Sequence, residues 1–291
     1  MVLFILFPGF GESHKYWEYK IQKSNKKYKL KKLNFLQQLK KIGKVYVYTP
    51  KVYNFLYYDT GPSSGWEDYA KIYCNLFKKP SQITLDDINI DKECKRIYKL
   101  LKNKNEKFVP MGHSIGSWFA FHFSNLYPSK CLNTIFLDGS YIIQNNLNNH
   151  FKEKVKKTKL KEITNNNLKL LYEIIIQNVK KNRYEYNETI NKYIKKILNI
   201  TFTYYYDIMK KELNGKLKIP TLSFTSLYFD TKTTKNSSEY NEINMERIEY
   251  NEALISKNKN INIQYLINAT HHPWTIQKHT DNIIKQLNLL L

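Results

Sequence analysis

Short apolar runs alternate along the chain with longer segments in which apolar residues recur every three or four positions. Short runs of this kind are typical of buried strands, since both faces of such a strand lie against other elements. The pattern predicts strands over Val2–Phe7, Val45–Thr49, Phe108–Met111, Thr134–Leu137, Thr221–Phe224 and Ile261–Ile267.

The segments between these runs have the three-to-four-residue periodicity of amphipathic helices. Helices are predicted over Lys27–Lys41, Asp91–Lys102 and Ile115–Tyr127, and a last helix carries Ile283, Ile284, Leu287 and Leu290. Alternating strands and helices favour the α/β class, a doubly wound and mostly parallel sheet of about six strands. Ligands of such sheets bind at the carboxyl ends of the strands.

One strand end carries a motif with a specific chemistry. The strand Phe108–Met111 runs directly into Gly112-His113-Ser114-Ile115-Gly116, and a predicted helix follows. A serine in a sharp strand-to-helix turn has a strained backbone that lifts its hydroxyl above the sheet, and the small residues around it prevent clashes. With nine glycines in the chain, such a match arises by chance in roughly one sequence in a hundred. The alternative is an ordinary glycine-rich turn.

This motif, together with the order of the elements, resembles the α/β-hydrolase superfamily over most of the chain. The resemblance implies that Ser114 is the nucleophile and that the amide of Ile115 contributes to an oxyanion hole. A second amide would come from Phe10 in the segment 7–11, which reads Phe-Pro-Gly-Phe-Gly. Pro8 replaces the histidine that is frequent there, so a plain strand-to-helix loop is the alternative for this segment.

Serine needs a base and a group that orients the base. The family places its histidine after the last strand, where this chain has His271 and His272. In the family this segment commonly ends in Gly-x-Gly-His. Comparison with that sequence favours His271 as the base, with His272 as the alternative. His14, His113 and His122 are less suitable, since the first lies in the oxyanion-side loop and the others belong to the elbow and its helix.

Two aspartates compete for the role of the acid. Asp230 follows the strand Thr221–Phe224, where the family usually keeps its acid, although the usual glycine-containing turn is missing. Asp138 ends the preceding strand, from which some members take the acid. We favour Asp230 and keep Asp138 as the alternative. For either aspartate, the alternative to a catalytic role is a carboxylate that faces solvent or caps a backbone turn.

A long segment with little strand character, between Asp138 and Pro220, indicates the domain organisation. Residues 1–140 and 216–291 are predicted to form the α/β-hydrolase core, and 141–215 a helical cap insertion that shapes the acyl pocket. The region Lys51–Pro80 offers aromatic side chains for the pocket wall or, equally, for the core. Because the first strand begins at Val2, the family's usual first two strands are expected to be absent.

Composition adds limits on location and partners. The 291 residues, 42% of them hydrophobic, are enough for one large core with an insertion, and the net charge is +22. Lysines occur along the whole chain, which favours a compositional bias over a binding face, and no specific nucleic-acid binding is expected. Lysines gathered on one surface would instead indicate a nucleic-acid or membrane binder.

The cysteines and the amino-terminal run indicate a cytoplasmic protein. Cys74, Cys94 and Cys131 are odd in number and far apart, which fits neither a disulfide framework nor a metal site. We therefore expect reduced thiols. The run Val2–Phe7 is too short to span a bilayer and has no basic region before it, so no transmembrane segment is expected.

Together these features predict a serine esterase or lipase-like hydrolase. It would act on a small-molecule carboxylic ester or related acyl substrate through an acyl-enzyme, without a metal or an organic cofactor. Epoxide hydrolases and haloalkane dehalogenases are disfavoured, since those relatives place aspartate where this chain has Ser114. The rival prediction is a non-catalytic binding protein that retains the fold.

Overall fold

The structure, a computed structural model, describes most of the core of the chain. The described residues are 1–9, 17–18, 34–48, 57–58, 72–73, 90–114, 116–139, 217–227, 244–245, 247–249, 251–252, 255–256, 258–269 and 272–291. The expected cap, residues 141–215, lies outside them, as does nearly all of Lys51–Pro80. The division into core and cap therefore stays a prediction.

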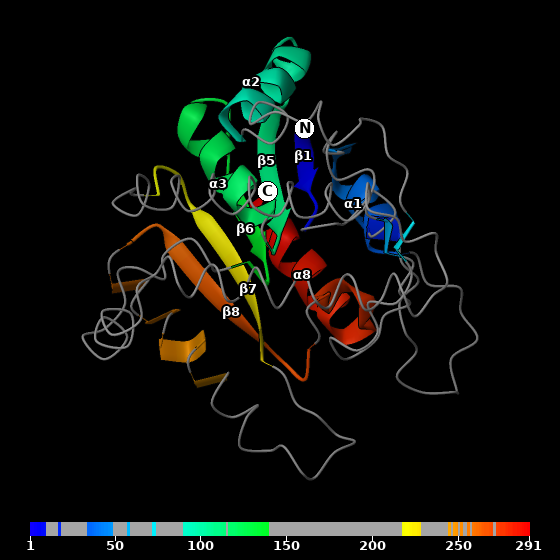
Figure 1. Cartoon of the computed structure of the whole chain (residues 1–291), viewed down its shortest axis with the longest axis vertical. Coiled ribbons are helices and arrows are strands. Elements are labelled where there is room, and N and C mark those ends of the chain that lie inside the picture. Colours follow the sequence, from blue (N-terminus) through cyan, green and yellow to red (C-terminus); the bar gives the residue numbers. More distant parts are fainter. Residues whose placement is uncertain are drawn as a thin grey trace, which may run out of the picture.

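A single six-stranded sheet forms the centre of the molecule (Figure 1). Its strand order is β2-β1-β5-β6-β7-β8, and every neighbouring pair in it is parallel. This confirms the predicted α/β class and the parallel sheet. The strands are β1 (Val2–Phe7), β2 (Lys44–Val47), β5 (Lys107–His113), β6 (Thr134–Leu137), β7 (Thr221–Leu227) and β8 (Ile261–Ile267).

The helices lie close to where the periodicity predicts them. They are α1 (Phe35–Ile42), α2 (Ile90–Leu101), α3 (Gly116–Leu126) and α8 (Gln277–Leu290). Helix α1 begins later than Lys27 because Asn34 caps it: the Asn34 side chain accepts a hydrogen bond from the Gln37 amide, and the Gln37 side chain accepts one from the Asn34 amide. The sequence analysis missed a 3₁₀ turn, η7 (Pro273–Thr275), and a short antiparallel pair, β3 (Tyr57–Tyr58) with β4 (Ile72–Tyr73).

Both faces of the central strands β1, β5 and β6 are covered, which explains why these strands are largely apolar. Along β1 the side chains alternate between two buried clusters. Leu3, Ile5 and Phe7 pack with residues of α2 and α3, whereas Phe4 and Leu6 pack with residues of α1 and α8. The centre of the sheet is thus a buried platform, whereas β7 carries buried polar side chains and the edge strand β8 is partly exposed.

Two further expectations concern cysteines and membranes. Cys94 and Cys131, the two cysteines in the described part, are buried and carry thiols. Burial raises the pKa of the Cys131 thiol to about 12, partly offset by a hydrogen bond with Ser124. Among the helices that the structure describes, none has the length and apolar character needed to cross a membrane.

Candidate active site

Ser114 lies in the turn between β5 and α3, with its backbone in the left-handed region. Its φ is 50°, a conformation that costs an L-residue about 1–2 kcal/mol and persists only where the surroundings impose it. Hydrogen bonds on both sides hold it: the Ser114 amide donates to Leu137 O at 3.1 Å, and the Ser117 amide donates to Ser114 O at 3.0 Å. This is the strained strand-to-helix turn that the motif predicts.

The two glycines of the motif are required by close packing. A Cβ on Gly112 would lie 2.2 Å from Gly116 O, and a Cβ on Gly116 would lie 2.2 Å from Phe7 O and 2.5 Å from Pro8 O. No side chain fits at such distances. The start of α3 therefore lies directly against the end of β1, and the loop that follows Gly9 begins beside the elbow. Phe10 and Ile115, the expected oxyanion donors, lie outside the described residues.

The turn after β6 packs against the same elbow. A Cβ on Gly139 would lie 1.8 Å from Ser117 Oγ and 2.6 Å from Ser114 O, so this position too needs glycine. The preceding residue, Asp138, has a φ of 49° and is only 2% exposed. The structure thus places the alternative acid in the chain segment next to the serine.

The carboxylate of Asp138 is engaged by the next strand and by an arginine. Its Oδ1 accepts a hydrogen bond from the Ser226 amide at 2.9 Å and one from Arg247 Nη1 at 2.6 Å. Arg247 Nη1 also donates to Ser226 O at 3.0 Å. Because Arg247 is 109 residues away in sequence from Asp138, no local pattern could have revealed this ion pair. Asp230, the favoured acid, lies outside the described residues.

The segment after β8 returns to the elbow through His272. Its ring centroid lies 4.8 Å from that of His113, the residue immediately before Ser114, and the two planes are inclined by 41°. Trp274 is close to both histidine rings, at 4.7 Å from His113 and 5.4 Å from His272. His271 lies outside the described residues, but its neighbour His272 packs against the residue next to the serine.

A buried aromatic stack fixes this segment. The Trp274 ring stacks on Trp17 at 4.8 Å and on Phe35 at 6.1 Å. Thr275 adds two hydrogen bonds to His272 O, one from its amide at 3.0 Å and one from its hydroxyl at 2.7 Å. The backbone at His272 is therefore held by both packing and hydrogen bonds. The sequence analysis missed this anchor because Trp17 and Trp274 are far apart along the chain.

His279 supports the start of the same segment. Its Nε2 lies 3.3 Å from Asn268 O, directly after β8, where Asn268 has a φ of 59°. Burial lowers the pKa of His279 below the usual histidine value, and nearby Lys278 lowers it further, against the opposing effect of the Asn268 carbonyl. The ring therefore tends to stay neutral where it packs.

The remaining histidines and possible metal ligands are placed as follows. His122 Nε2 lies 3.2 Å from Asp91 Oδ1, so this histidine links α3 to α2. His14 and His150 lie outside the described residues. In the described ranges, no three His, Cys, Asp or Glu side chains come together as a metal site would need.

Comparison with solved structures identifies the class of fold. No family model matches the sequence. No curated protein matches it either. Many solved structures do match, and those similar to this chain include hydrolytic enzymes. The strand order, the elbow and these similarities together show that the chain has the α/β-hydrolase fold.

Three of these structures illustrate the likeness. A probable hydrolytic enzyme from Pseudomonas aeruginosa has a TM-score of 0.55 and 12% identity, with 100% of this chain and 85% of that chain covered. A laboratory-evolved potato epoxide hydrolase has a TM-score of 0.52 and 13% identity, with 99% and 93% covered. A carboxylesterase structure from the thaumarchaeon Nitrososphaera gargenis has a TM-score of 0.51 and 15% identity, with 99% and 90% covered.

Proposed function

We propose that this protein is a serine hydrolase that cleaves a carboxylic ester or a related acyl substrate through an acyl-enzyme formed on Ser114. The observation that carries the proposal is the left-handed backbone of Ser114, with φ of 50°, at the junction of β5 and α3. Such strain is retained where it serves a site, and here the strained residue is the serine that follows the carboxyl end of β5. Ligands of parallel sheets bind at those ends.

In the proposed mechanism, Ser114 Oγ attacks the acyl carbon while His271 removes its proton. The leaving alcohol takes that proton from His271, and the acyl group stays on the serine. Water then attacks the acyl-enzyme, and His271 acts first as base and then as acid. Asp230 orients the histidine and stabilises its charged form, and the amides of Phe10 and Ile115 stabilise the oxyanion.

Two contacts in the described part support this arrangement. The first is the packing of Gly116 against Phe7 O and Pro8 O, because it starts the Phe10 loop beside the serine turn. The second is the tilted packing of the His272 ring against the His113 ring. His271 is the residue immediately before His272 in the chain.

The surroundings of His272 favour His271 as the base. The His272 ring packs on His113 and Trp274, two rings that are themselves buried. A ring used in this way has a packing role, and the neighbouring histidine is left as the candidate for proton transfer. In the same manner, the ion pair of Asp138 with Arg247 supports a structural role for Asp138 and favours Asp230 as the acid.

The names of the similar structures support hydrolysis as the reaction class. They include a carboxylesterase and an epoxide hydrolase. The residue in the elbow of this chain is a serine, whose hydroxyl forms esters with acyl groups, so acyl transfer is the chemistry that it can perform.

A fluorophosphonate probe tests the proposal without knowledge of the substrate. We expect the native protein to be labelled, Ser114→Ala to lose labelling while keeping its circular dichroism spectrum, and Ser129→Ala to be labelled normally. Ser129 is a suitable control because it is exposed and contacts Lys107 only through its carbonyl oxygen. Equal labelling of Ser114→Ala would remove this serine from the mechanism, and an unlabelled native protein would favour a non-catalytic binding protein.

A further inference from the structure

The amino ends of the strands carry a concentration of lysines that the proposed hydrolase does not use. In a parallel sheet with helical crossovers, each helix that leads into a strand ends at this side. We call the loops and last helical turns at this side the amino-end face. Its lysines are Lys40, Lys41, Lys44, Lys99, Lys102, Lys104, Lys107, Lys130, Lys218 and Lys259.

Acidic residues are rare among the described residues of the amino-end face. Glu106 is the single acidic side chain among its described residues, and it pairs with Lys44. The other described charges nearly balance. They are the basic Lys92, Lys95, Arg96, Arg247, Lys278 and Lys285 and the acidic Glu18, Asp91, Glu93, Asp138, Glu249, Glu252 and Asp281. In the described part of the chain, the positive excess is therefore localised, although the sequence suggested an even spread.

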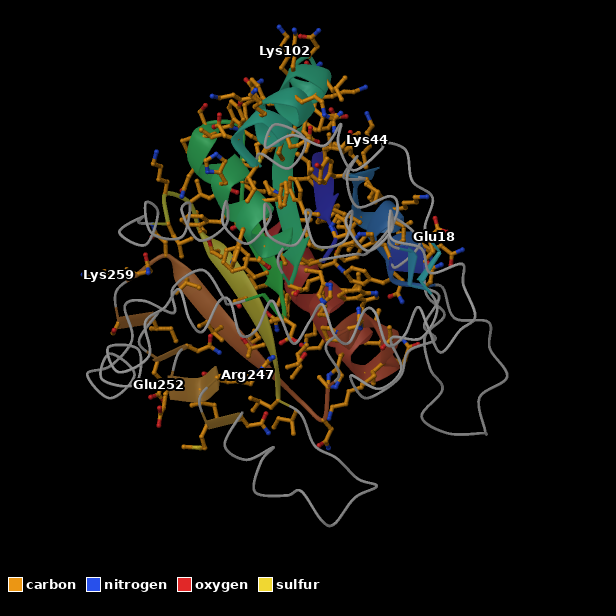
Figure 2. The ribbon with its side chains drawn as sticks, in the orientation of Figure 1. Glu18, Lys44, Lys102, Arg247, Glu252 and Lys259 are labelled. Atoms are coloured by element: carbon orange, nitrogen blue, oxygen red, sulfur yellow. The ribbon has the colours of Figure 1, made fainter. Side chains whose placement is uncertain are left out.

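Most of these lysines are available to a partner, whereas Lys44 is paired with Glu106. All except the partly buried Lys130 are exposed. Lys107 Nζ donates to Ser129 O at 2.7 Å and Lys218 Nζ donates to Asn125 O at 3.1 Å, neutral contacts that leave the positive charges unbalanced. Figure 2 shows Lys44 and Lys102 at the top of the molecule, while Arg247 lies low in the view, near the carboxyl ends of the strands.

Exposed apolar side chains accompany the lysines. Leu100, in the last turn of α2 between Lys99 and Lys102, is 58% exposed. Helix α8 starts after β8 and runs back along the sheet, so its last turn comes to the same end, where Leu289 is 72% exposed. Exposed leucines beside lysines are typical of surfaces that rest on a lipid bilayer.

We propose that the amino-end face docks on a membrane surface rich in anionic lipids. Lysines near such a surface are attracted by its negative potential, and apolar side chains enter the headgroup region. Nucleic-acid surfaces typically add arginines and exposed aromatic rings, and the described residues of this face include no arginine. The serine turn lies at the opposite ends of the strands, so docking through the amino-end face does not involve it.

Vesicle sedimentation tests the proposal with the full chain. The probes are vesicles of phosphatidylcholine alone and vesicles containing about one-third phosphatidylserine, at low and at physiological salt. The test variant combines Lys99→Gln, Lys102→Gln and Lys104→Gln. The control combines Lys92→Gln, Lys95→Gln and Lys278→Gln, which removes the same charge from outside the amino-end face.

We expect binding only to the phosphatidylserine vesicles, weakened by salt. Each lysine lost from the docking face should weaken binding roughly fivefold, so the test variant should lose more than about 100-fold and the control much less. Leu100→Gln should weaken vesicle binding further, a loss that electrostatic attraction alone does not explain.

Three results would overturn the proposal. One is no binding to phosphatidylserine vesicles at low salt. Another is an equal loss in both triple variants, which would mean that only net charge matters. The third is tighter binding to a nucleic-acid duplex than to vesicles, which would assign the face to that partner. Because these measurements involve no turnover, they are independent of the labelling of Ser114.

Discussion

Arg247 Nη1 lies 2.6 Å from Asp138 Oδ1, and this ion pair joins the turn after β6 to a segment 109 residues further along the chain. The Asp138 side chain is fully buried and that of Arg247 nearly so. A buried carboxylate is tolerated where charge and hydrogen bonds compensate for lost water, as Arg247 and the Ser226 amide do here. The pair therefore holds the carboxyl ends of β6 and β7 together beside the serine turn.

Removing the arginine should destabilise the protein strongly. Arg247→Met leaves the Asp138 charge buried without its cation, and such losses typically reduce the free energy of unfolding by about 3–5 kcal/mol. Urea unfolding checks this. The double variant with Asp138→Asn should be less destabilised than the sum of the single changes, because the orphaned charge is gone. Strictly additive effects would show that the pair contributes little.

Gly116 should tolerate no side chain. The added methyl group of Gly116→Ala would lie 2.2 Å from Phe7 O, so β1 and α3 must separate, at a cost of at least about 1–3 kcal/mol. We expect lower stability and lower fluorophosphonate labelling per folded molecule. Gly43→Ala is the matched control, since its Cβ would meet Val2 Cγ2 at 2.8 Å, away from the serine. If both variants lose labelling alike, the packing at Gly116 is not specific to the site.

The two adjacent histidines should differ in their effect on turnover. His271→Ala removes the proposed base and should lower the kcat of ester hydrolysis by several orders of magnitude. His272→Ala removes a ring that packs on His113 and should mainly lower stability, with a smaller effect on kcat. Steady-state kinetics with a chromogenic ester, alongside thermal unfolding, separates the two effects. The reverse ranking of kcat would assign the base to His272.

Replacing the two aspartates should also have different effects on turnover and stability. Asp230→Asn keeps the size of the side chain and loses its charge, so kcat should fall by as much as about 10⁴-fold with little change in KM. Asp138→Asn should have a mild effect on kcat and a clear one on stability, because Arg247 loses its partner. Full activity in Asp230→Asn, or an experimental structure with Asp138 bonded to the histidine, would move the acid to the earlier strand.

Acid should weaken the fold through His279. Its pKa in the folded state lies below the usual value near 6.5, chiefly because the ring is buried. Above that value the ring is neutral in both states and the full stability is present. As the pH falls, the unfolded chain takes up the proton first, so stability decreases toward and through the folded-state pKa. His279→Gln should lose stability less steeply between about pH 7 and pH 5 in urea titrations. An unchanged slope would show that His279 is not responsible.

The sequence predicted the sheet well because a buried parallel strand needs an apolar run, and such runs are visible locally. It predicted β7 too short, since the strand continues through the buried residues Thr225 and Ser226, whose polar groups bind partners distant in sequence. Thr225 Oγ1 accepts a hydrogen bond from Asn251, and the Ser226 amide donates to Asp138. Propensity carries no information on such partners.

The candidate site likewise has features that a local motif predicts and features that depend on distant segments. The strained turn at Ser114 could be predicted because it needs glycines at fixed spacing, a constraint that leaves a local motif. Arg247 and the pairing of Trp17 with Trp274 could not, because they depend on how distant segments meet. The choice between Asp230 and Asp138 has the same origin, since only the course of two separate loops decides which carboxylate reaches the histidine.

The contact of Gly116 with Phe7 also bears on how the chain folds. It joins the first strand to a helix more than a hundred residues later, and this helix begins two residues after the strained Ser114. Closing so long a loop costs entropy before any contact compensates for it, and such pairings slow folding. We therefore expect the serine turn to form only once β1 and β5 pair, so chains that have not completed the core would lack the proposed nucleophile in its folded geometry.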